Sequence, residues 1–152
     1  MHKEDLNQAM NEALKIAHKR ETPFGAVLID INYKVLDAAA NSSSTDGPLA
    51  HAEMNLLNKA GSQLGDLSKY ALVSTCEPCP MCMGAIMWHG IEKVYFGASI
   101  ADASKYISQL KITAKEVAEK SGKNTEVEGG ILRSRCIELF EIFYSSSGTD
   151  KG

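Results

Sequence analysis

Residues 70–98 read YALVSTCEPCPMCMGAIMWHGIEKVYFGA, and this stretch decides the fold. Its first seven residues, 70–76, form a short apolar run with the length expected of a buried strand. Residues 78–89 follow as a predicted helix, with proline near its start and Gly90 directly after its end. A second apolar run, rich in branched and aromatic side chains, predicts another strand at 93–99. A strand, a helix and a strand in succession are typical of an α/β domain.

The same alternation continues on both sides of this stretch. We predict helices at 4–20, 50–60, 103–120 and 131–143, strands at 24–31, 34–40 and 125–130, and a loop at 41–48. The helix at 50–60 is expected to end at Gly61. The sequence therefore indicates one α/β domain over residues 1–144, with helices on both faces of a single sheet. The polar tail, 145–152, is expected to be disordered.

Composition excludes several classes of protein. The chain has 152 residues, a formal net charge of −3 and 44% hydrophobic residues. This length favours one domain, and the hydrophobic fraction is too high for a disordered chain. No apolar run approaches the ~20 residues that cross a bilayer. A mildly acidic chain lacks the basic surface that nucleic-acid binding usually requires. The N-terminal residues do not resemble a secretory signal, so we expect a cytoplasmic location.

Clustered cysteines in such a chain are more often metal ligands or catalysts than disulfides. Cys79 and Cys82 are three residues apart at the start of a predicted helix, so their side chains share one helix face. A helix N-terminus favours thiolates. Together with His51, at the start of the preceding helix, they form a donor set that selects zinc. Three protein ligands leave the fourth position of a tetrahedral ion for water.

Other residues compete for that fourth position. Cys76 would complete a closed structural site, and its spacing from the other cysteines also resembles part of an iron–sulfur motif. Such a cluster needs a fourth cysteine, but Cys136 lies on an apolar helix face and is expected to pack in the core. His89 is about 10 Å along the helix from Cys82. We expect Cys76 to be a buried thiol that does not bind the metal.

Glu53 follows His51 by two residues, so the two side chains do not point the same way from a helix. We expect its carboxylate to reach over the metal as a general base and acid. Two thiolates neutralise the charge of zinc, so a nearby proton acceptor offsets the weaker activation of water. The alternative of a metalloprotease fails because no H-E-x-x-H motif is present.

These residues give HAE at 51–53 and CEPCPMC at 76–82, flanked by PFGAVLI at 23–29 and GAIMWHGIEKVYFGA at 84–98. The joint pattern resembles the cytidine-deaminase-like superfamily, in the branch of guanine, tRNA adenosine and fungal cytosine deaminases. The resemblance implies a three-layer α/β/α sandwich with a mostly five-stranded mixed sheet, one zinc ion per subunit and a homodimer. It also implies hydrolytic deamination, in which zinc-bound hydroxide attacks the amino-bearing ring carbon and Glu53 shuttles the protons.

The resemblance also suggests the substrate. Asn41, Trp88 and Asp102 match substrate-side positions of these deaminases, although Trp88 could instead pack in the core and Asp102 could cap a helix. The candidate substrate contacts are Asn41, Ala52, Phe24, Trp88 and Asp102. A purine base or nucleoside is the expected small-molecule substrate, with guanine first.

The main alternative is a tRNA adenosine, followed by cytosine. The C-terminal helix carries Glu138 and Glu141 where a tRNA-binding enzyme would favour basic residues. A zinc-stapled module without catalysis is the rival from a different class, and it would need four protein ligands.

Overall fold

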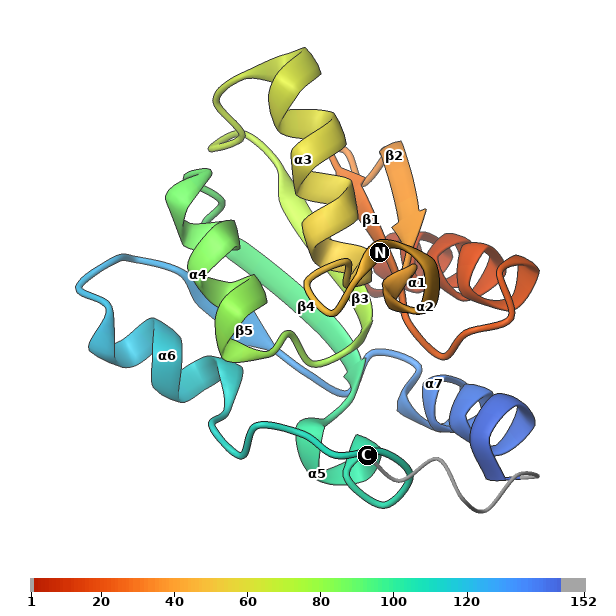
Figure 1. The fold of residues 1–152 in the computed structure, drawn as a ribbon. Helices are drawn as coiled ribbons and strands as arrows, with labels where there is room; N and C mark the ends of the chain where they lie inside the picture. Colours follow the sequence, from red (N-terminus) through yellow and green to blue (C-terminus); the bar gives the residue numbers. More distant parts are fainter. Residues whose placement is uncertain (1, 146–152) are drawn as a thin grey trace.

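A five-stranded mixed sheet forms the centre of the molecule (Figure 1). The computed structural model describes residues 2–145, and the strand order is β2-β1-β3-β4-β5. Strand β1 pairs antiparallel with β2 and β3, whereas β3, β4 and β5 are parallel. The strands are β1 Gly25–Ile29, β2 Val35–Ala40, β3 Ala71–Cys76, β4 Lys93–Ala98 and β5 Glu126–Glu128.

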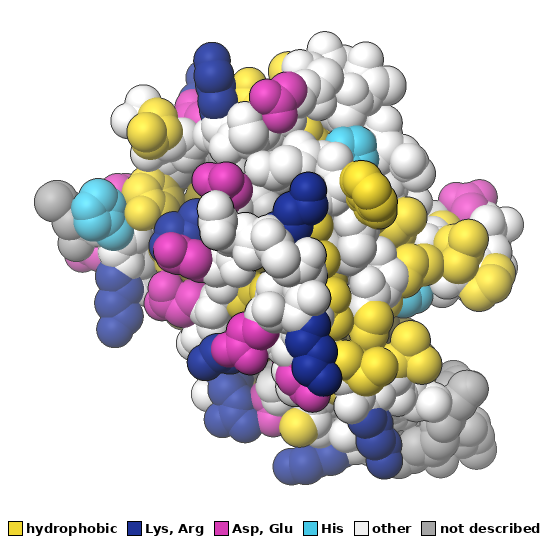
Figure 2. Space-filling view, turned by 90° about the vertical axis from the view of Figure 1, so that its left-hand side faces the viewer, with side chains coloured by type: hydrophobic (Ala, Val, Ile, Leu, Met, Phe, Trp, Pro, Cys, Tyr) yellow, Lys and Arg dark blue, Asp and Glu magenta, His cyan; other side chains and the backbone are white. Residues whose placement is uncertain are grey.

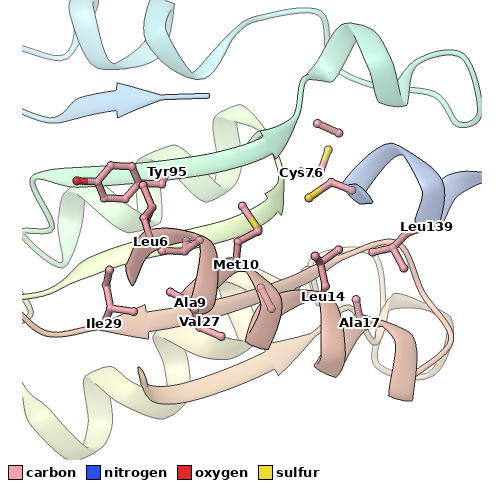
Figure 3. Packing of buried hydrophobic residues seen from close by; sticks show 14 of the residues in the cluster. Leu6, Ala9, Met10, Leu14, Ala17, Val27, Ile29, Cys76, Tyr95 and Leu139 are labelled. Carbon is pink, nitrogen blue, oxygen red and sulfur yellow. The ribbon is translucent and has the colours of Figure 1, made fainter. Parts of the chain in front are cut away.

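Helices α1 (His2–Lys19) and α7 (Arg133–Phe140) cover one face of the sheet, and a π-helical turn at Glu141–Ser145 extends α7. One apolar stripe of α1 points at the strands (Figure 3). Helix α1 approaches β1 so closely that a Cβ on Gly25 would lie 2.3 Å from the carbonyl oxygen of Ala13. Glycine is therefore required at the start of β1.

Helices α3 (Ala52–Leu64), α4 (Pro80–Trp88) and α6 (Ala114–Lys120) cover the opposite face. Two four-residue helices, α2 (Ser43–Asp46) and α5 (Ile100–Ala103), lie in connections. Two separate clusters of buried apolar residues, one on each face of the sheet, confirm the expected three layers. Among the described residues, no helix is both long and apolar enough to cross a membrane.

The segment 103–120 departs most from the prediction of one helix. Helix α5 ends at Ala103, residues 104–113 are irregular, and α6 begins only at Ala114. Serine and threonine caps explain the division. Ser99 forms a capping box with Asp102, and Thr113 forms another with Glu116. Each capping box starts a new helix. The residues between the two boxes include branched, weakly helix-forming side chains and belong to neither helix.

Two smaller predictions were also wrong, and a third was not tested. Helix α3 passes Gly61 and ends at Gly65, whose φ of 76° suits glycine. Gly61 instead makes room for the ring of His89, because a Cβ there would lie 2.6 Å from it. The predicted loop at 41–48 contains α2. The tail predicted to be disordered lies, beyond residue 145, outside the described residues.

Candidate active site

Three potential metal ligands meet where α3 and α4 begin. His51 directly precedes α3, Cys79 directly precedes α4, and Cys82 lies in the first turn of α4. His51 Nδ1 lies 3.6 Å from the sulfur of Cys79 and 3.6 Å from that of Cys82. Bond lengths of about 2.0 Å to nitrogen and about 2.3 Å to sulfur place the two atoms about 3.6 Å apart on a tetrahedral zinc. These side chains therefore fit zinc without rearrangement.

The pKa values of Cys79, His51 and Cys82 are shifted because these three side chains interact with one another. Hydrogen bonding with the Cys82 thiol and with His51 lowers the pKa of Cys79 to about 4. The hydrogen bond to Cys79 raises the pKa of His51. The same partner, together with burial, raises the pKa of Cys82. One thiolate thus holds protons on its two neighbours, and a divalent cation would replace those protons.

Among residues 2–145, the cluster contains three protein ligands and no fourth. In the described part of the chain, the donor atoms that lie within 4.8 Å of one another belong to His51, Cys79 and Cys82. Cys76 is buried at the end of β3, and burial raises the pKa of its thiol well above the usual value. Three ligands characterise a catalytic zinc site, in which the fourth position takes water or substrate. This arrangement disfavours a closed, purely structural centre.

The carboxylate of Glu53 lies beside the ligands in the first turn of α3. Its side chain is buried, with 6% of the residue exposed, and burial raises its pKa. Ser74 on β3 donates a hydrogen bond from its hydroxyl to Glu53 Oε2 at 3.2 Å. The serine fixes the carboxylate without neutralising it. A buried carboxyl with a raised pKa holds a proton more readily than an exposed one, which suits it to transfer protons during a reaction.

A cavity of about 190 Å³ opens above these groups. Its lining combines the metal-site residues with apolar and neutral polar side chains from distant parts of the sequence. The lining residues are Phe24, Asn41, Ser43, His51, Glu53, Cys76, Glu77, Cys79, Ile107, Ser108, Gln109, Leu110 and Tyr144. Such a small, mixed cavity can hold a flat polar ring between apolar walls.

The structure brings two of the five predicted substrate contacts to this cavity. Phe24 and Asn41 line it, and the Asn41 Oδ1 accepts a hydrogen bond from the Ser43 N–H at 3.3 Å. Ala52 is fully buried at the first position of α3. Trp88 is 86% exposed at the C-terminal end of α4, near Lys123. Within the described chain, neither Ala52 nor Trp88 is a lining residue.

Asp102 has other partners. Its carboxylate forms two hydrogen bonds with the Arg133 guanidinium, at 2.9 and 2.7 Å, and accepts the N–H of Ser99 at 2.9 Å. The Arg133 guanidinium in particular lowers the pKa of Asp102 well below the usual range. Asp102 thus has a capping role, but as the third residue of α5 in the capping box of Ser99 and not as the first cap of a helix that follows it. Its pair with Arg133 joins α5 to α7.

Sequence reasoning did not find several lining residues. The cavity-lining role of residues 107–110 was missed because the sequence predicts a continuous helix at 103–120. Tyr144 lies in the π-helical turn after α7, where no pattern indicates a cavity. Glu77 carried a detectable signal, because it is a carboxylate placed directly between Cys76 and Cys79 in an otherwise apolar segment.

Comparison with known proteins agrees with this geometry. Residues 2–98 match the family model described as the cytidine and deoxycytidylate deaminase zinc-binding region. The tRNA-specific adenosine deaminase of Bacillus subtilis is 34% identical over 142 residues, which are 91% of this chain and 86% of that protein. The guanine deaminase of Bacillus subtilis is 33% identical over 105 residues, which are 68% of this chain and 67% of that protein.

A solved structure supports the fold. Guanine deaminase from Nitrosomonas europaea superposes with a TM-score of 0.77 at 22% identity, covering 93% of this chain and 83% of that one. The match extends well beyond the metal motif, into the C-terminal part of the sheet. The donor geometry, the buried carboxylate and the family match lead to one conclusion. This chain is a zinc-dependent deaminase and belongs to the cytidine and deoxycytidylate deaminase zinc-binding family.

Proposed function

We propose that this deaminase acts on a free purine base, with guanine as the first candidate. The observation that carries the proposal is the cavity of about 190 Å³, which lies directly over the metal ligands and Glu53. Pockets for drug-sized ligands measure roughly 300–1,000 Å³, so this one suits a single base better than a larger molecule. Apolar Phe24 and Ile107 can flank a ring, while Asn41 and Gln109 offer donors and acceptors for its edge.

The residues of the chain divide the chemical work. Zinc, when bound by His51, Cys79 and Cys82, supplies a Lewis acid that activates water near neutral pH. Glu53 takes a proton from the attacking water and delivers it to a ring nitrogen of the base. The second proton of that water reaches the leaving amine by the same carboxylate, so water and the amino compound become a carbonyl and ammonia. Ser74 keeps the carboxylate in place through both transfers.

The surface charge supports a small substrate. Basic and acidic side chains are interspersed over most of the face in Figure 2, and several basic side chains lie toward its lower edge. The formal net charge of −3 also disfavours a polyanion. Neither of the substrate contacts predicted at Asp102 and Trp88 reaches the cavity of this single chain, so both stay predictions.

A tRNA adenosine is the second candidate. It is favoured by the extent of the match to the tRNA-specific adenosine deaminase, which covers most of both chains. A base flipped out of a stem-loop would use the same cavity and the same proton transfers. Cytosine is the third candidate.

The test is ammonia release by the zinc-loaded protein from guanine, adenosine, cytosine and a tRNA anticodon stem-loop. We expect guanine to react with the highest kcat/KM. Reaction of the stem-loop alone would replace the first candidate by the second. No release from any of the four would contradict both.

We also propose that residues 1–144 act as one catalytic domain in a cytoplasmic homodimer. None of the four cysteines forms a disulfide, as a reducing compartment favours. Helix α4 has no charged side chain, yet Trp88 at its end is exposed, which is consistent with a second copy covering this side. Sedimentation equilibrium would give twice the mass of the chain. A single-chain mass at micromolar concentration would contradict the dimer.

A further inference from the structure

Glu77 lies between Cys76 and Cys79 in the sequence, but its carboxylate accepts hydrogen bonds from main-chain N–H groups much later in the chain. The side chain is buried, with 7% of the residue exposed. Oε1 accepts a hydrogen bond from the N–H of Ile100 at 2.8 Å, and Oε2 accepts one from the N–H of Ala114 at 2.8 Å. Its own N–H donates to the carbonyl of Ala98 at 2.8 Å. Each carboxylate oxygen is therefore occupied by a main-chain donor.

The two donors occupy equivalent positions. Ile100 is the first residue of α5 and Ala114 is the first residue of α6. The capping boxes of the two helices satisfy the N–H groups of Ser99, Asp102, Thr113 and Glu116 but leave the first helical N–H without a local partner. One buried carboxylate supplies the missing acceptor to both helices. The first N–H groups of two helices that are separate in the sequence, α5 and α6, thus donate to the same carboxylate.

The chain between these two points forms one wall of the cavity. Residues 104–113 are irregular, and Ile107, Ser108, Gln109 and Leu110 line the same cavity as the metal-site residues His51 and Cys79. The middle of the segment rests on α7, because the Tyr106 ring stacks on Phe140 at 5.5 Å. We call residues 107–110 the substrate wall. Both ends of the segment that carries it are held by Glu77, so displacement of that carboxylate would move the wall.

We propose that Glu77 is a positioning residue that fixes the substrate wall relative to the metal ligands and thereby sets substrate affinity and selectivity. The loop that supplies Cys79 to the metal also supplies the anchor of the substrate wall. Residues 77–79 therefore contribute both a metal ligand and the anchor of the segment that carries the substrate wall. The choice of substrate for the assay rests on the function proposed above, whereas the anchoring itself does not.

The main test uses Glu77→Gln in the zinc-loaded protein. An amide has one accepting oxygen, so one of the two main-chain N–H groups loses its acceptor and faces an NH2 group instead. We expect zinc content to stay at one per chain and kcat to stay within about threefold. KM for guanine should rise about tenfold or more, because the loss of a buried hydrogen bond loosens the wall. Hydrogen exchange at residues 107–113 should accelerate about tenfold, with exchange at 80–88 unchanged.

A second variant reaches the same contact from the other side. Ala114→Pro removes the N–H that Glu77 Oε2 accepts and leaves residue 77 intact. Proline is favoured at the first position of a helix, and Thr113, with φ −75° and ψ 155°, already has the extended conformation that a residue before proline adopts. We expect the same rise in KM and in exchange at 107–113. This variant keeps the test decisive if Glu77→Gln fails to fold.

Thr113→Val is the matched control, because it removes the side-chain cap of α6 but leaves the Glu77 contact. It should speed exchange in the first turn of α6 and leave KM within about twofold. Loss of zinc from Glu77→Gln, with exchange at 107–113 unchanged, would overturn the inference. So would an unchanged KM in both Glu77→Gln and Ala114→Pro. Failure of the wild type to act on guanine would overturn the proposed substrate only, since the exchange measurement needs no substrate.

Discussion

The two sides of the cavity are built in different ways. The metal side comes from two short motifs at the starts of α3 and α4. Its three donors either directly precede one of these helices or lie in its first turn. The substrate wall, 107–110, comes from an irregular segment between two short helices. The segment that carries this wall is held by contacts distant in the sequence, because Glu77 accepts the N–H groups of Ile100 and Ala114 and Tyr106 stacks on α7.

The two sides therefore serve different purposes: the metal side carries out the reaction, and the substrate wall determines which substrate binds. Metal binding and proton transfer require fixed distances, and helix starts within a packed core provide them. Substrate choice depends on a wall that can change without altering those distances, as loops on a rigid scaffold commonly do. Variants on the metal side should therefore abolish activity, whereas variants of the wall and its supports should change affinity or stability.

The largest effect is expected from Cys82→Ser. A serine hydroxyl is a poor zinc ligand, so zinc content should fall at least tenfold and ammonia release about 10³-fold or more. Zinc analysis and a steady-state assay measure both. Cys136→Ser makes the same chemical change at a core thiol beside Gly97 and should keep zinc. Equal zinc loss in both variants would contradict the assignment of Cys82 as a ligand.

Ser74→Ala should have a smaller effect on the same side. The hydroxyl that fixes Glu53 is lost, and a hydrogen bond to a charged group contributes about 1.5 kcal/mol, which is about tenfold in rate. We expect kcat to fall by that factor with KM and zinc content unchanged. A fall in zinc content would show that Ser74 supports the metal loop instead.

Asp102→Asn tests a support of the wall. The variant weakens the charged contact that joins α5 to α7, and we expect it to lower the free energy of unfolding by about 1–3 kcal/mol at neutral pH. Because Arg133 holds the pKa of Asp102 well below its usual value, this contribution is complete above pH ~5, begins to decrease near pH ~4 and is lost only as the pH falls through the folded-state pKa.

Denaturant unfolding from pH 7 to pH 3 measures the difference between wild type and Asp102→Asn. The two curves should converge toward the acid end. A gap that does not change with pH would show that the carboxylate charge contributes nothing.

The smallest effect is expected from Trp88→Leu. Trp88 is largely exposed and is not among the residues that line the cavity, so KM and kcat should change less than about twofold. Phe24→Leu provides the comparison, because Phe24 lines the cavity, and its KM should rise more than that of Trp88→Leu. A tenfold rise in KM for Trp88→Leu would instead support the substrate contact predicted from the sequence.

Sequence reasoning was strongest where spacing along one element carries the chemistry. Cys79 and Cys82 could be paired before any coordinates because residues three apart share a helix face, and His51 joined them because it opens another predicted helix and its imidazole completes a zinc donor set. The layered arrangement of one sheet between helices followed from alternating apolar runs and was confirmed, although the helix predicted at 103–120 is divided in two.

The substrate wall could not be predicted in this way. The charged, helix-like composition of 103–120 predicts one helix, although two capping boxes divide the segment. Nothing in the local sequence indicates that residues 107–110 line the cavity at the metal site. Asp102 shows the same limit. Its partner Arg133 is 31 residues away, and only the folded chain shows that this carboxylate is occupied by an arginine.

The central claim is that Glu53 performs proton transfer at a zinc site formed by three ligands, and Glu53→Gln tests it most directly. The amide keeps the shape of the side chain and can still accept a hydrogen bond from Ser74, but it cannot shuttle protons. The measurement is zinc content and ammonia release from one preparation. The account predicts one zinc per chain and a loss of about 10³-fold or more in kcat. Full zinc content with activity within tenfold of the wild type would contradict it.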